Sequence, residues 1–410
     1  MAQSSLVSRR SFMRYAGTAA AAVPLLSESQ TLLAADGSHH VDPDTGPPRN
    51  PDANAVIVSS NENPLGPSAG ALAAMSAAMR QGGRYHNEAK DQVVEAFSRS
   101  FDLKPGYVSM WAGSTPGLDM ALRWNIGPGK ALVVGNPSYE QGPRAAEAMK
   151  APLHSVPLTP AGAHDVRAMV AATRNVGTYY IVNPNNPTGT MTPREDLLWL
   201  LEHKPAGSIV IVDEAYHHFS KDEPMIDQVI ADKDIIVSRT FSKIYGMAGL
   251  RAGFYIARPD LQPGSIFRVG PAAMIDGAFQ VSMATAHACT ASLADSTLVP
   301  TRRKINADIR DATLEWMDKR GYKVYAGSQA NFFMVDVKRP GRDFAALMQR
   351  QNVYIGRTWP AMPTYVRITV GTASEMAKFQ TAFAKAYDTA PSMAHAELPY
   401  DAPSELGFVA

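Results

Sequence analysis

Four clusters of polar residues each follow a short apolar run, and together they contain groups that could bind a ligand and react with it. Residues 113–117 are rich in glycine and hydroxyl groups, and residues 183–189 read Asn-Pro-Asn-Asn-Pro-Thr-Gly. The third cluster begins with Asp213, and the fourth ends with Lys243. In a parallel α/β sheet, ligands bind at the carboxyl ends of the strands. The clusters therefore predict one site at one edge of a sheet.

Each cluster also has an ordinary structural explanation when it is taken singly. The Asn-Pro run consists of common turn-forming residues, and Asp213 could cap the following helix. Lys243 could be a surface lysine, and residues 113–115 could start a helix without any ligand. What indicates a site is that the four clusters occur in order on successive strand ends.

The composition restricts the class of protein. A chain of 410 residues with 45% hydrophobic content can form two or three domains of about 150 residues each. Lys and Arg (39) nearly balance Asp and Glu (38), so no basic surplus predicts nucleic-acid binding. The single cysteine excludes an intramolecular disulfide and metal centres built on several thiolates. No apolar run approaches the ~20 residues needed to span a bilayer. We therefore expect a large soluble α/β protein.

The first 35 residues differ from the rest and predict an export signal. An Arg-Arg pair at 9–10 precedes a small and apolar stretch at 15–26, and no acidic residue occurs before Glu28. This order is typical of twin-arginine signals, and the alternative is a short amphipathic helix with an incidental arginine pair. Proline-rich residues 36–54 predict an extended lead-in. We expect a periplasmic or exported protein that the twin-arginine machinery receives already folded and loaded with its cofactor.

Alternating apolar runs and helical patterns predict the elements that position the clusters. Short β-branched runs bounded by turn residues are typical of parallel strands buried on both faces. Such runs occur at Tyr107–Trp111, Ala131–Val134, Thr178–Val182, Ser208–Val212, Ile235–Val237 and Phe254–Ala257. Helical spacing predicts helices at 70–81 and 88–101.

After about residue 300 the pattern becomes that of an α+β segment. Strands are predicted at 332–337, 353–357 and 365–370, and helices at 301–319, 342–350 and 374–387. We therefore expect an α/β fold that contains a large ligand-binding domain with a mostly parallel sheet and a smaller α+β domain. The expected boundaries are 81–298 for the large domain, 299–390 for the small domain, 55–80 for an N-terminal segment that joins the small domain, and 391–410 for a tail.

The clustered residue types are those that pyridoxal 5'-phosphate requires. A lysine forms a Schiff base with this cofactor, and an aspartate keeps its pyridine nitrogen protonated. Hydroxyl groups, an arginine and a helix N-terminus bind its phosphate. The histidine pairs at 39–40 and 217–218 are sequence neighbours that do not converge on one ion, so we expect no metal site.

Over roughly residues 55–388 the sequence resembles the fold-type I (class I/II) pyridoxal-phosphate-dependent aminotransferases, especially those of the histidinol-phosphate aminotransferase type. The motifs that carry the resemblance are Asn61–Pro64, Arg84-Tyr85, Pro137–Tyr139, Asn183–Gly189, Asp213–Tyr216, Thr240–Lys243, Ala248–Arg251, Ser328–Phe332 and Val366–Thr372. The resemblance implies an enzyme that moves an amino group from an amino acid or related amine to a 2-oxo acid.

The resemblance also implies a role for individual residues around the cofactor ring. Lys243 would form the Schiff base and move the proton, and Asp213 would pair with the pyridinium nitrogen. Asn186 and Tyr216 would hydrogen-bond the ring oxygen, and Tyr139 would stack on the ring.

Further residues would bind the phosphate and the substrate. The implied phosphate ligands are Ser114, Thr115, Thr240, Ser242 and Arg251. Tyr85 would reach the phosphate of the neighbouring subunit, which implies a homodimer with shared active sites. Arg367 would hold the substrate carboxylate or its equivalent as a planar bidentate donor. Arg357 and Asn331 are the other candidate substrate-binding residues.

Two departures from the family pattern bear on the substrate. Thr115-Pro116 stands where the family often has an Asp-Glu pair. Arg357 matches an arginine that binds the substrate's phosphate in histidinol-phosphate enzymes, and the alternative is a surface arginine at a strand end. The bulk of Trp359 and Met362 beside it predicts a preference for something other than a phosphate. Export favours the same conclusion, because histidine biosynthesis is cytosolic.

Two other functions remain open from the sequence. The same scaffold supports lyases, decarboxylases, racemases and oxidases that act on amino acids, and these share the cofactor-binding residues. A non-catalytic binding protein with the same fold would be expected to have lost Lys243 or Asp213, and the chain retains both.

Overall fold

The computed structural model describes residues 51–262 and 281–389 of the chain. The predicted export signal at 1–35, the lead-in up to residue 50 and the predicted tail at 391–410 lie outside the described residues. Within the described part of the chain, no helix is both long and apolar enough to cross a membrane.

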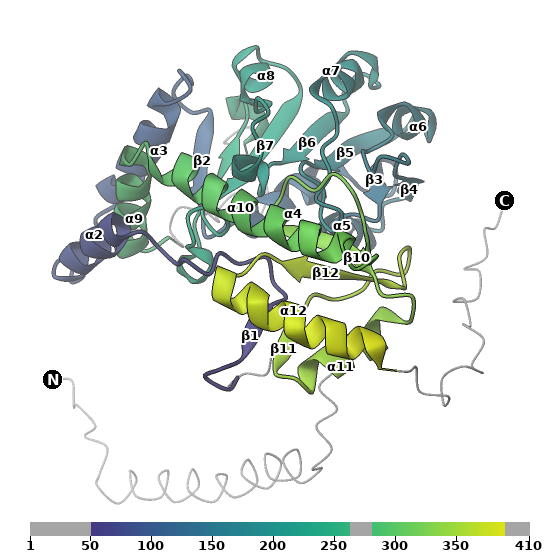
Figure 1. Ribbon diagram of the computed structural model, residues 1–410. Helices are drawn as coiled ribbons and strands as arrows, with labels where there is room; N and C mark the ends of the chain where they lie inside the picture. The colour runs from purple at the N-terminus through teal and green to yellow at the C-terminus, as the bar shows by residue number, and fades with distance from the viewer. Residues whose placement is uncertain (1–50, 263–280, 390–410) are drawn as a thin grey trace, which may run out of the picture. The chain divides into compact units, whose positions relative to one another are not determined.

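A seven-stranded sheet of order β2-β8-β7-β6-β5-β3-β4 holds the predicted clusters (Figure 1). All pairings are parallel except the two that β8 makes with β2 and β7. The strands are β2 (Val108–Trp111), β3 (Ala131–Asn136), β4 (Leu153–Pro157), β5 (Val176–Val182), β6 (Ile209–Asp213), β7 (Ile235–Thr240) and β8 (Gly253–Ile256). The expected α/β fold with a mostly parallel sheet flanked by helices is therefore confirmed.

Helices cover both faces of this sheet, which explains why its central strands are apolar throughout. Every residue of β5 is buried. Tyr179 and Ile181 belong to one hydrophobic cluster, whereas Tyr180 and Val182 belong to another, because successive strand residues point to opposite faces. The first cluster includes residues of α2 (Ala69–Met79), α3 (Glu88–Arg99), α6 (Val166–Ala171), α7 (Arg194–His203), α8 (Ile226–Ile230) and α9 (Met283–Ala294). The second includes residues of α4 (Ser114–Asn125) and α5 (Gln141–Met149).

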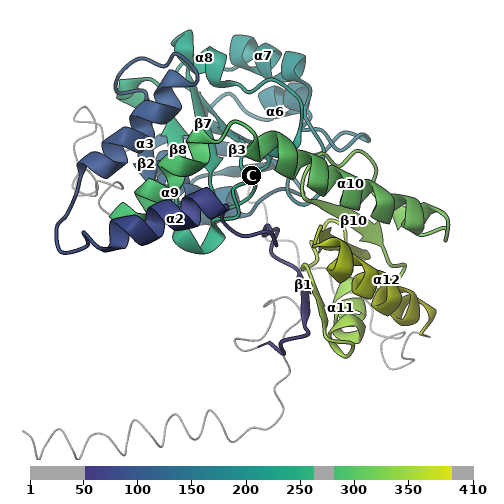
Figure 2. The same ribbon diagram turned by 60° about the vertical axis from the view of Figure 1, so that its left-hand side comes forward.

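A second group of strands is built from the beginning and the end of the described chain (Figure 2). β1 (Val56–Val58) pairs in parallel with β11 (Val353–Ile355). β10 (Phe332–Asp336) lies between β12 (Tyr365–Thr369) and β9 (Lys323–Val324) in an antiparallel sheet. The accompanying helices are α10 (Leu298–Asp318), α11 (Gly341–Gln349) and α12 (Ala373–Asp388).

Val56 and Val58 share a hydrophobic cluster with Phe333, Phe344 and other residues from the last quarter of the chain. Strand β1 of the segment at 55–80 thus belongs to this core. The segment's helix α2 contacts α9 instead. Because the described residues all belong to one compact unit, the expected boundary between a large and a small domain stays a prediction.

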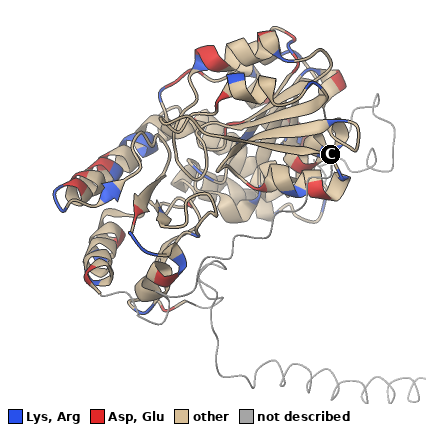
Figure 3. Cartoon of the chain, turned by 90° about the vertical axis from the view of Figure 1, so that its right-hand side faces the viewer, with Lys and Arg blue, Asp and Glu red and all other residues tan. Residues whose placement is uncertain are grey.

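The strands of the seven-stranded sheet contain only two charged side chains, Asp213 in β6 and Arg239 in β7. The other Lys, Arg, Asp and Glu residues of this region lie on helices and loops (Figure 3). Burying an ion costs free energy unless a partner compensates its charge. The partners of these two residues therefore indicate what each one does.

Candidate active site

Arg239 has its partner within the protein. Its Nη2 lies 2.7 Å from Glu214 Oε2, and its Nε donates to the same oxygen at 2.8 Å. The second oxygen, Glu214 Oε1, accepts a hydrogen bond from the Met225 backbone N–H at 2.8 Å. This pair accounts for one of the two buried strand charges.

Asp213 has no such cation. It accepts hydrogen bonds from the Tyr180 hydroxyl and the Ala215 backbone N–H, both at 3.1 Å. No lysine or arginine within the described residues hydrogen-bonds to it. Burial raises the pKa of Asp213 to about 6. A buried carboxylate that lacks a hydrogen-bonded cation fits a ligand that supplies a cationic N–H, as the protonated pyridine nitrogen of pyridoxal phosphate does.

Lys243 follows β7 at the same edge of the sheet. Its Nζ donates to the Ser60 carbonyl oxygen at 3.3 Å and lies 5.4 Å from the centre of the Tyr216 ring. Burial lowers the pKa of Lys243 to about 8, and the nearby Arg367 contributes to the shift. A lowered pKa leaves a larger neutral fraction of the amine near pH 7, which is the form that attacks a carbonyl carbon.

The residues predicted to bind the phosphate surround the N-terminus of α4. Gly113 precedes this helix with φ = 85°, and a Cβ atom there would overlap the Arg251 guanidinium. Arg251 Nη1 donates to Ser242 Oγ at 3.2 Å, and Thr240 Oγ1 donates to the same oxygen at 3.0 Å. Free helix N–H groups, hydroxyls and a guanidinium together suit a phosphate group. Ser114 and Thr115 are the first two residues of α4.

Tyr139 lies close to Asp213 and the phosphate end of the site. Burial raises the pKa of its hydroxyl, and the charges of Asp213 and Tyr216 add to the shift. A hydrogen bond with Thr115 acts in the opposite direction. The structure therefore brings Tyr139 to the place where a ring between Asp213 and α4 would lie.

Arg367 enters the site from β12 and is buried. Its Nη1 donates to Asn186 Oδ1 at 2.6 Å, and its Nη2 donates to the Ser59 carbonyl oxygen at 2.7 Å. Burial lowers the pKa of Arg367 to about 10. Both bonded oxygens are neutral, so the guanidinium keeps its positive charge available for an anion.

Tyr216 lies among the same residues. Its hydroxyl accepts a hydrogen bond from Asn61 Nδ2 at 3.0 Å, and its ring meets Phe332 edge to face. The hydroxyl proton of Tyr216 can therefore be directed toward a ligand, as the predicted role requires.

Arg357 forms an ion pair with Glu140. The Cζ of Arg357 lies 4.8 Å from the centre of the Trp359 ring, and the Cζ of Arg367 lies 5.2 Å from it. Sequence reasoning missed Glu140, although it directly follows Tyr139. Its position next to Tyr139, a residue predicted to stack on the cofactor ring, was the sequence feature that could have identified it.

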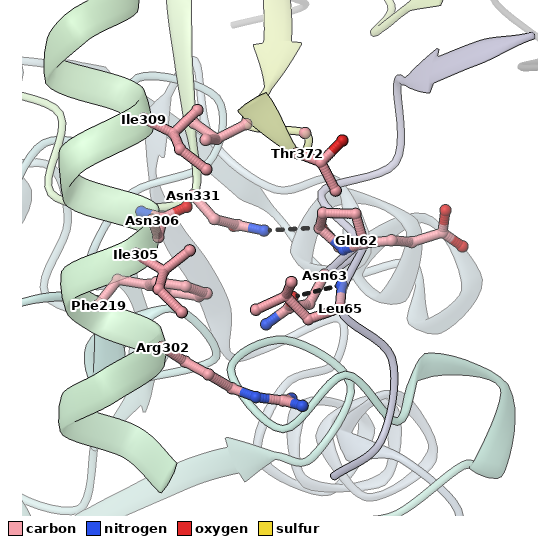
Figure 4. A pocket seen from close by; sticks show the side chains of 13 residues that line it. Glu62, Asn63, Leu65, Phe219, Arg302, Ile305, Asn306, Ile309, Asn331 and Thr372 are labelled. Atoms are coloured by element: carbon pink, nitrogen blue, oxygen red, sulfur yellow. Dashed lines mark hydrogen bonds between the residues drawn. The ribbon is translucent and has the colours of Figure 1, made fainter. Parts of the chain in front are cut away.

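Asn331 is directed toward the segment at 61–62 (Figure 4). Its Nδ2 donates to the carbonyl oxygens of Asn61 and Glu62, both at 3.1 Å. It lines a pocket with residues of α10, such as Asn306, and none of the other predicted site residues lines that pocket. Asn331 therefore supports the chain segment that carries Asn61, the hydrogen-bond partner of Tyr216. Its predicted contact with substrate stays a prediction.

Tyr85 is the predicted residue that lies apart from the others. It follows α2, and 93% of its surface is exposed. No residue of the described chain covers its ring, and its role in the site of a neighbouring subunit stays a prediction.

The chain matches the family model for aminotransferase class I and II over residues 47–383. Among curated proteins, it is 33% identical to histidinol-phosphate aminotransferase 1 of Nitrosococcus oceani, with 79% of this chain and 87% of that protein covered. It is 31% identical to an aromatic amino acid aminotransferase of Streptomyces avermitilis, with 77% and 86% covered.

A solved structure has the same fold. The histidinol-phosphate aminotransferase of Sinorhizobium meliloti in complex with pyridoxal 5'-phosphate superposes with a TM-score of 0.72 at 23% identity, covering 80% of this chain and 90% of that one. The family model and the curated relatives confirm the expectation of a pyridoxal-phosphate-dependent transaminase, and the solved structure shows the same fold. With a family model that matches most of its length, the chain belongs to the class I and II aminotransferases.

Proposed function

We propose that this aminotransferase uses Lys243 as its catalytic amine and accepts amino acids that carry a free carboxylate. The observation that carries the proposal is the convergence of Lys243, Asp213 and Arg367 on one site. Pyridoxal phosphate, when bound, would supply an electron-withdrawing ring for the transfer of an amino group from an amino acid to a 2-oxo acid.

The protein's own residues would then perform four tasks. Asp213 holds a proton on the ring nitrogen, because its buried carboxylate gains a cationic partner. Tyr216 and Asn186 donate hydrogen bonds to the ring oxygen. Lys243 Nζ would move the proton between the α-carbon of the substrate and the C4′ carbon of the cofactor. Arg367 fixes the carboxylate with its planar donors, which orients that α-carbon hydrogen toward Lys243.

The proposal extends to the assembly and the location of the enzyme. An exposed Tyr85 supports a homodimer in which Tyr85 completes the partner's phosphate site. The Arg-Arg pair at 9–10 and the apolar stretch after it support export by the twin-arginine machinery to the periplasm.

Visible absorption of the purified protein tests the role of Lys243. We expect a yellow absorption band from bound pyridoxal phosphate, and reduction with borohydride should fix the cofactor to Lys243. Addition of an amino acid that is a substrate should bleach the band and release the matching 2-oxo acid. Lys243→Ala should lower turnover by at least about 10³-fold, and peptide mapping should find no fixed cofactor. A protein that binds pyridoxal phosphate without bleaching would indicate a lyase or an oxidase instead. A yellow, active Lys243→Ala variant would contradict the proposal.

A further inference from the structure

Two arginines share one buried indole ring at the substrate end of the site. The guanidinium carbons of Arg357 and Arg367 lie 4.8 and 5.2 Å from the centre of the Trp359 ring. Trp359 itself is 4% exposed, and its Nε1 has no hydrogen-bond partner within the described residues. An anion that reached Arg367 would therefore also meet the charges around Arg357.

The two arginines differ in what already neutralises them. Among the described residues, Arg367 donates only to neutral oxygens, those of Asn186 and Ser59. Arg357 instead pairs with the carboxylate of Glu140. Besides burial, the charge of Arg357 lowers the pKa of Arg367 and the charge of Glu140 raises it, so all three groups lie close enough to interact. Two guanidinium groups and one carboxylate leave a net charge of +1 at this end of the site.

A net charge of +1 matches one class of substrate anion better than another. An amino-acid carboxylate carries one negative charge, whereas a phosphate monoester carries about −1.5 to −2 at pH 7. The second charge of a phosphate would lie beside the Glu140 carboxylate, with Arg357 already paired. Discrimination of this kind depends on a repulsive group as well as an attractive one.

We propose that Glu140 is a specificity-determining residue, which by pairing with Arg357 makes the site select a carboxylate and reject a phosphate monoester. The inference rests on the proposed function, since it assumes that Arg367 binds the substrate anion. The buried indole strengthens the effect, because it excludes water from one side of the two guanidinium groups and so reduces screening there.

Two donors with the same ring provide a matched comparison. L-histidine and L-histidinol phosphate share the imidazole and the amino-bearing carbon. Histidine carries a carboxylate where histidinol phosphate carries a phosphate monoester. For the cofactor-loaded wild-type protein we expect kcat/KM to favour histidine. Glu140→Gln should shift the ratio at least about tenfold toward the phosphate, because it removes the repulsive charge and frees Arg357. The double variant E140Q/R357Q should return toward the wild-type ratio, since its net charge is again +1.

Binding of unreactive compounds gives a readout that does not depend on turnover. 3-(Imidazol-4-yl)propanoate and the corresponding propyl phosphate both lack the amino group, and calorimetry on the cofactor-loaded proteins measures their Kd values. Tighter binding of the phosphate by the wild-type protein, no shift in E140Q, or no binding of either compound would overturn the inference. Failure of the proposed function differs from these results, because it would show as a protein without the yellow band or one that no amino acid bleaches.

Discussion

At the scale of single residues, the free protein keeps a buried charge that its ligand would compensate. Asp213 is hydrogen-bonded by neutral donors, and its pKa is raised from 3.8 to about 6. A carboxyl whose folded pKa exceeds its unfolded pKa destabilises the fold once it ionises. This loss of folding free energy grows as pH rises from about 4 to 6, and it is fully present above that range. Below both pKa values it vanishes.

Asp213→Asn should therefore stabilise the cofactor-free protein at pH 8, by up to about 3 kcal/mol on the conversion of pKa shift to free energy. Asparagine cannot ionise, and the Tyr180 hydroxyl can turn from donor to acceptor toward the new amide. Urea unfolding at pH 8 and pH 5 measures the difference, which should be smaller at pH 5. Asp318→Asn, at an exposed position, is the matched control. A variant less stable than the wild type at pH 8 would contradict the role assigned to burial.

At the scale of elements, the turn between β2 and α4 is shaped to admit the Arg251 guanidinium. Gly113 has φ = 85°, in the region that side chains with a Cβ rarely adopt. Gly106 has a similar φ of 82°, but a Cβ there would meet only Pro259 Cγ at 3.6 Å. The two glycines therefore share the backbone conformation and differ in what lies next to them.

Gly113→Ala and Gly106→Ala should each cost about 1 kcal/mol or more of folding free energy, because both place alanine at positive φ. Of the two variants, only Gly113→Ala should weaken pyridoxal phosphate binding, by about tenfold or more. The added Cβ displaces the Arg251 guanidinium from its place among the residues predicted to bind the phosphate. Absorbance titration of the cofactor-free proteins measures the Kd. Equal Kd values for the two variants would mean that Arg251 does not bind the phosphate.

The elements that the sequence predicts best are those buried on both faces. The run Thr178–Val182 has only apolar or aromatic residues after its threonine, because helices cover both sides of β5. β4 was missed since it is the edge strand of the sheet and mostly exposed or half-buried. The antiparallel direction of β8 leaves no trace in its residue types, because a fully buried strand is apolar in either direction.

The candidate site could be predicted wherever a motif places a residue at a strand end. Asp213 and Lys243 follow from that logic and lie at the same edge of the sheet. The pair of Glu140 with Arg357 could not be predicted, because its members are far apart in sequence and meet only through the fold. Local patterns carry no information about such a contact.

At the scale of the whole molecule, shared active sites would make each subunit incomplete. Co-expression of Lys243→Ala and Tyr85→Ala chains with two different tags tests this directly. Each homodimer should show weak cofactor binding or low turnover. The purified heterodimer should have one intact site and about half of the wild-type activity. A heterodimer no more active than the mixture of homodimers would place Tyr85 outside the partner's site.

Export can be tested on the intact chain. We expect the periplasmic form to have lost its first 35 residues or so, which mass measurement of the secreted protein detects. Replacing Arg9 and Arg10 with lysine should retain the full-length protein in the cytoplasm, with its yellow cofactor band unchanged. Normal export of that variant would rule out the twin-arginine route.

The pairing of β1 with β11 also sets an order of events during synthesis. Val56 is made early, yet its strand partner Val353 leaves the ribosome nearly 300 residues later. Until then the apolar face of β1 has no core to join, because the cluster that holds Val56 is otherwise built from the last part of the chain. The growing chain must keep its first strand unpaired through most of translation, and a chain that stops early cannot close that core. The pairing of β1 with β11 can therefore form only after most of the chain has been made.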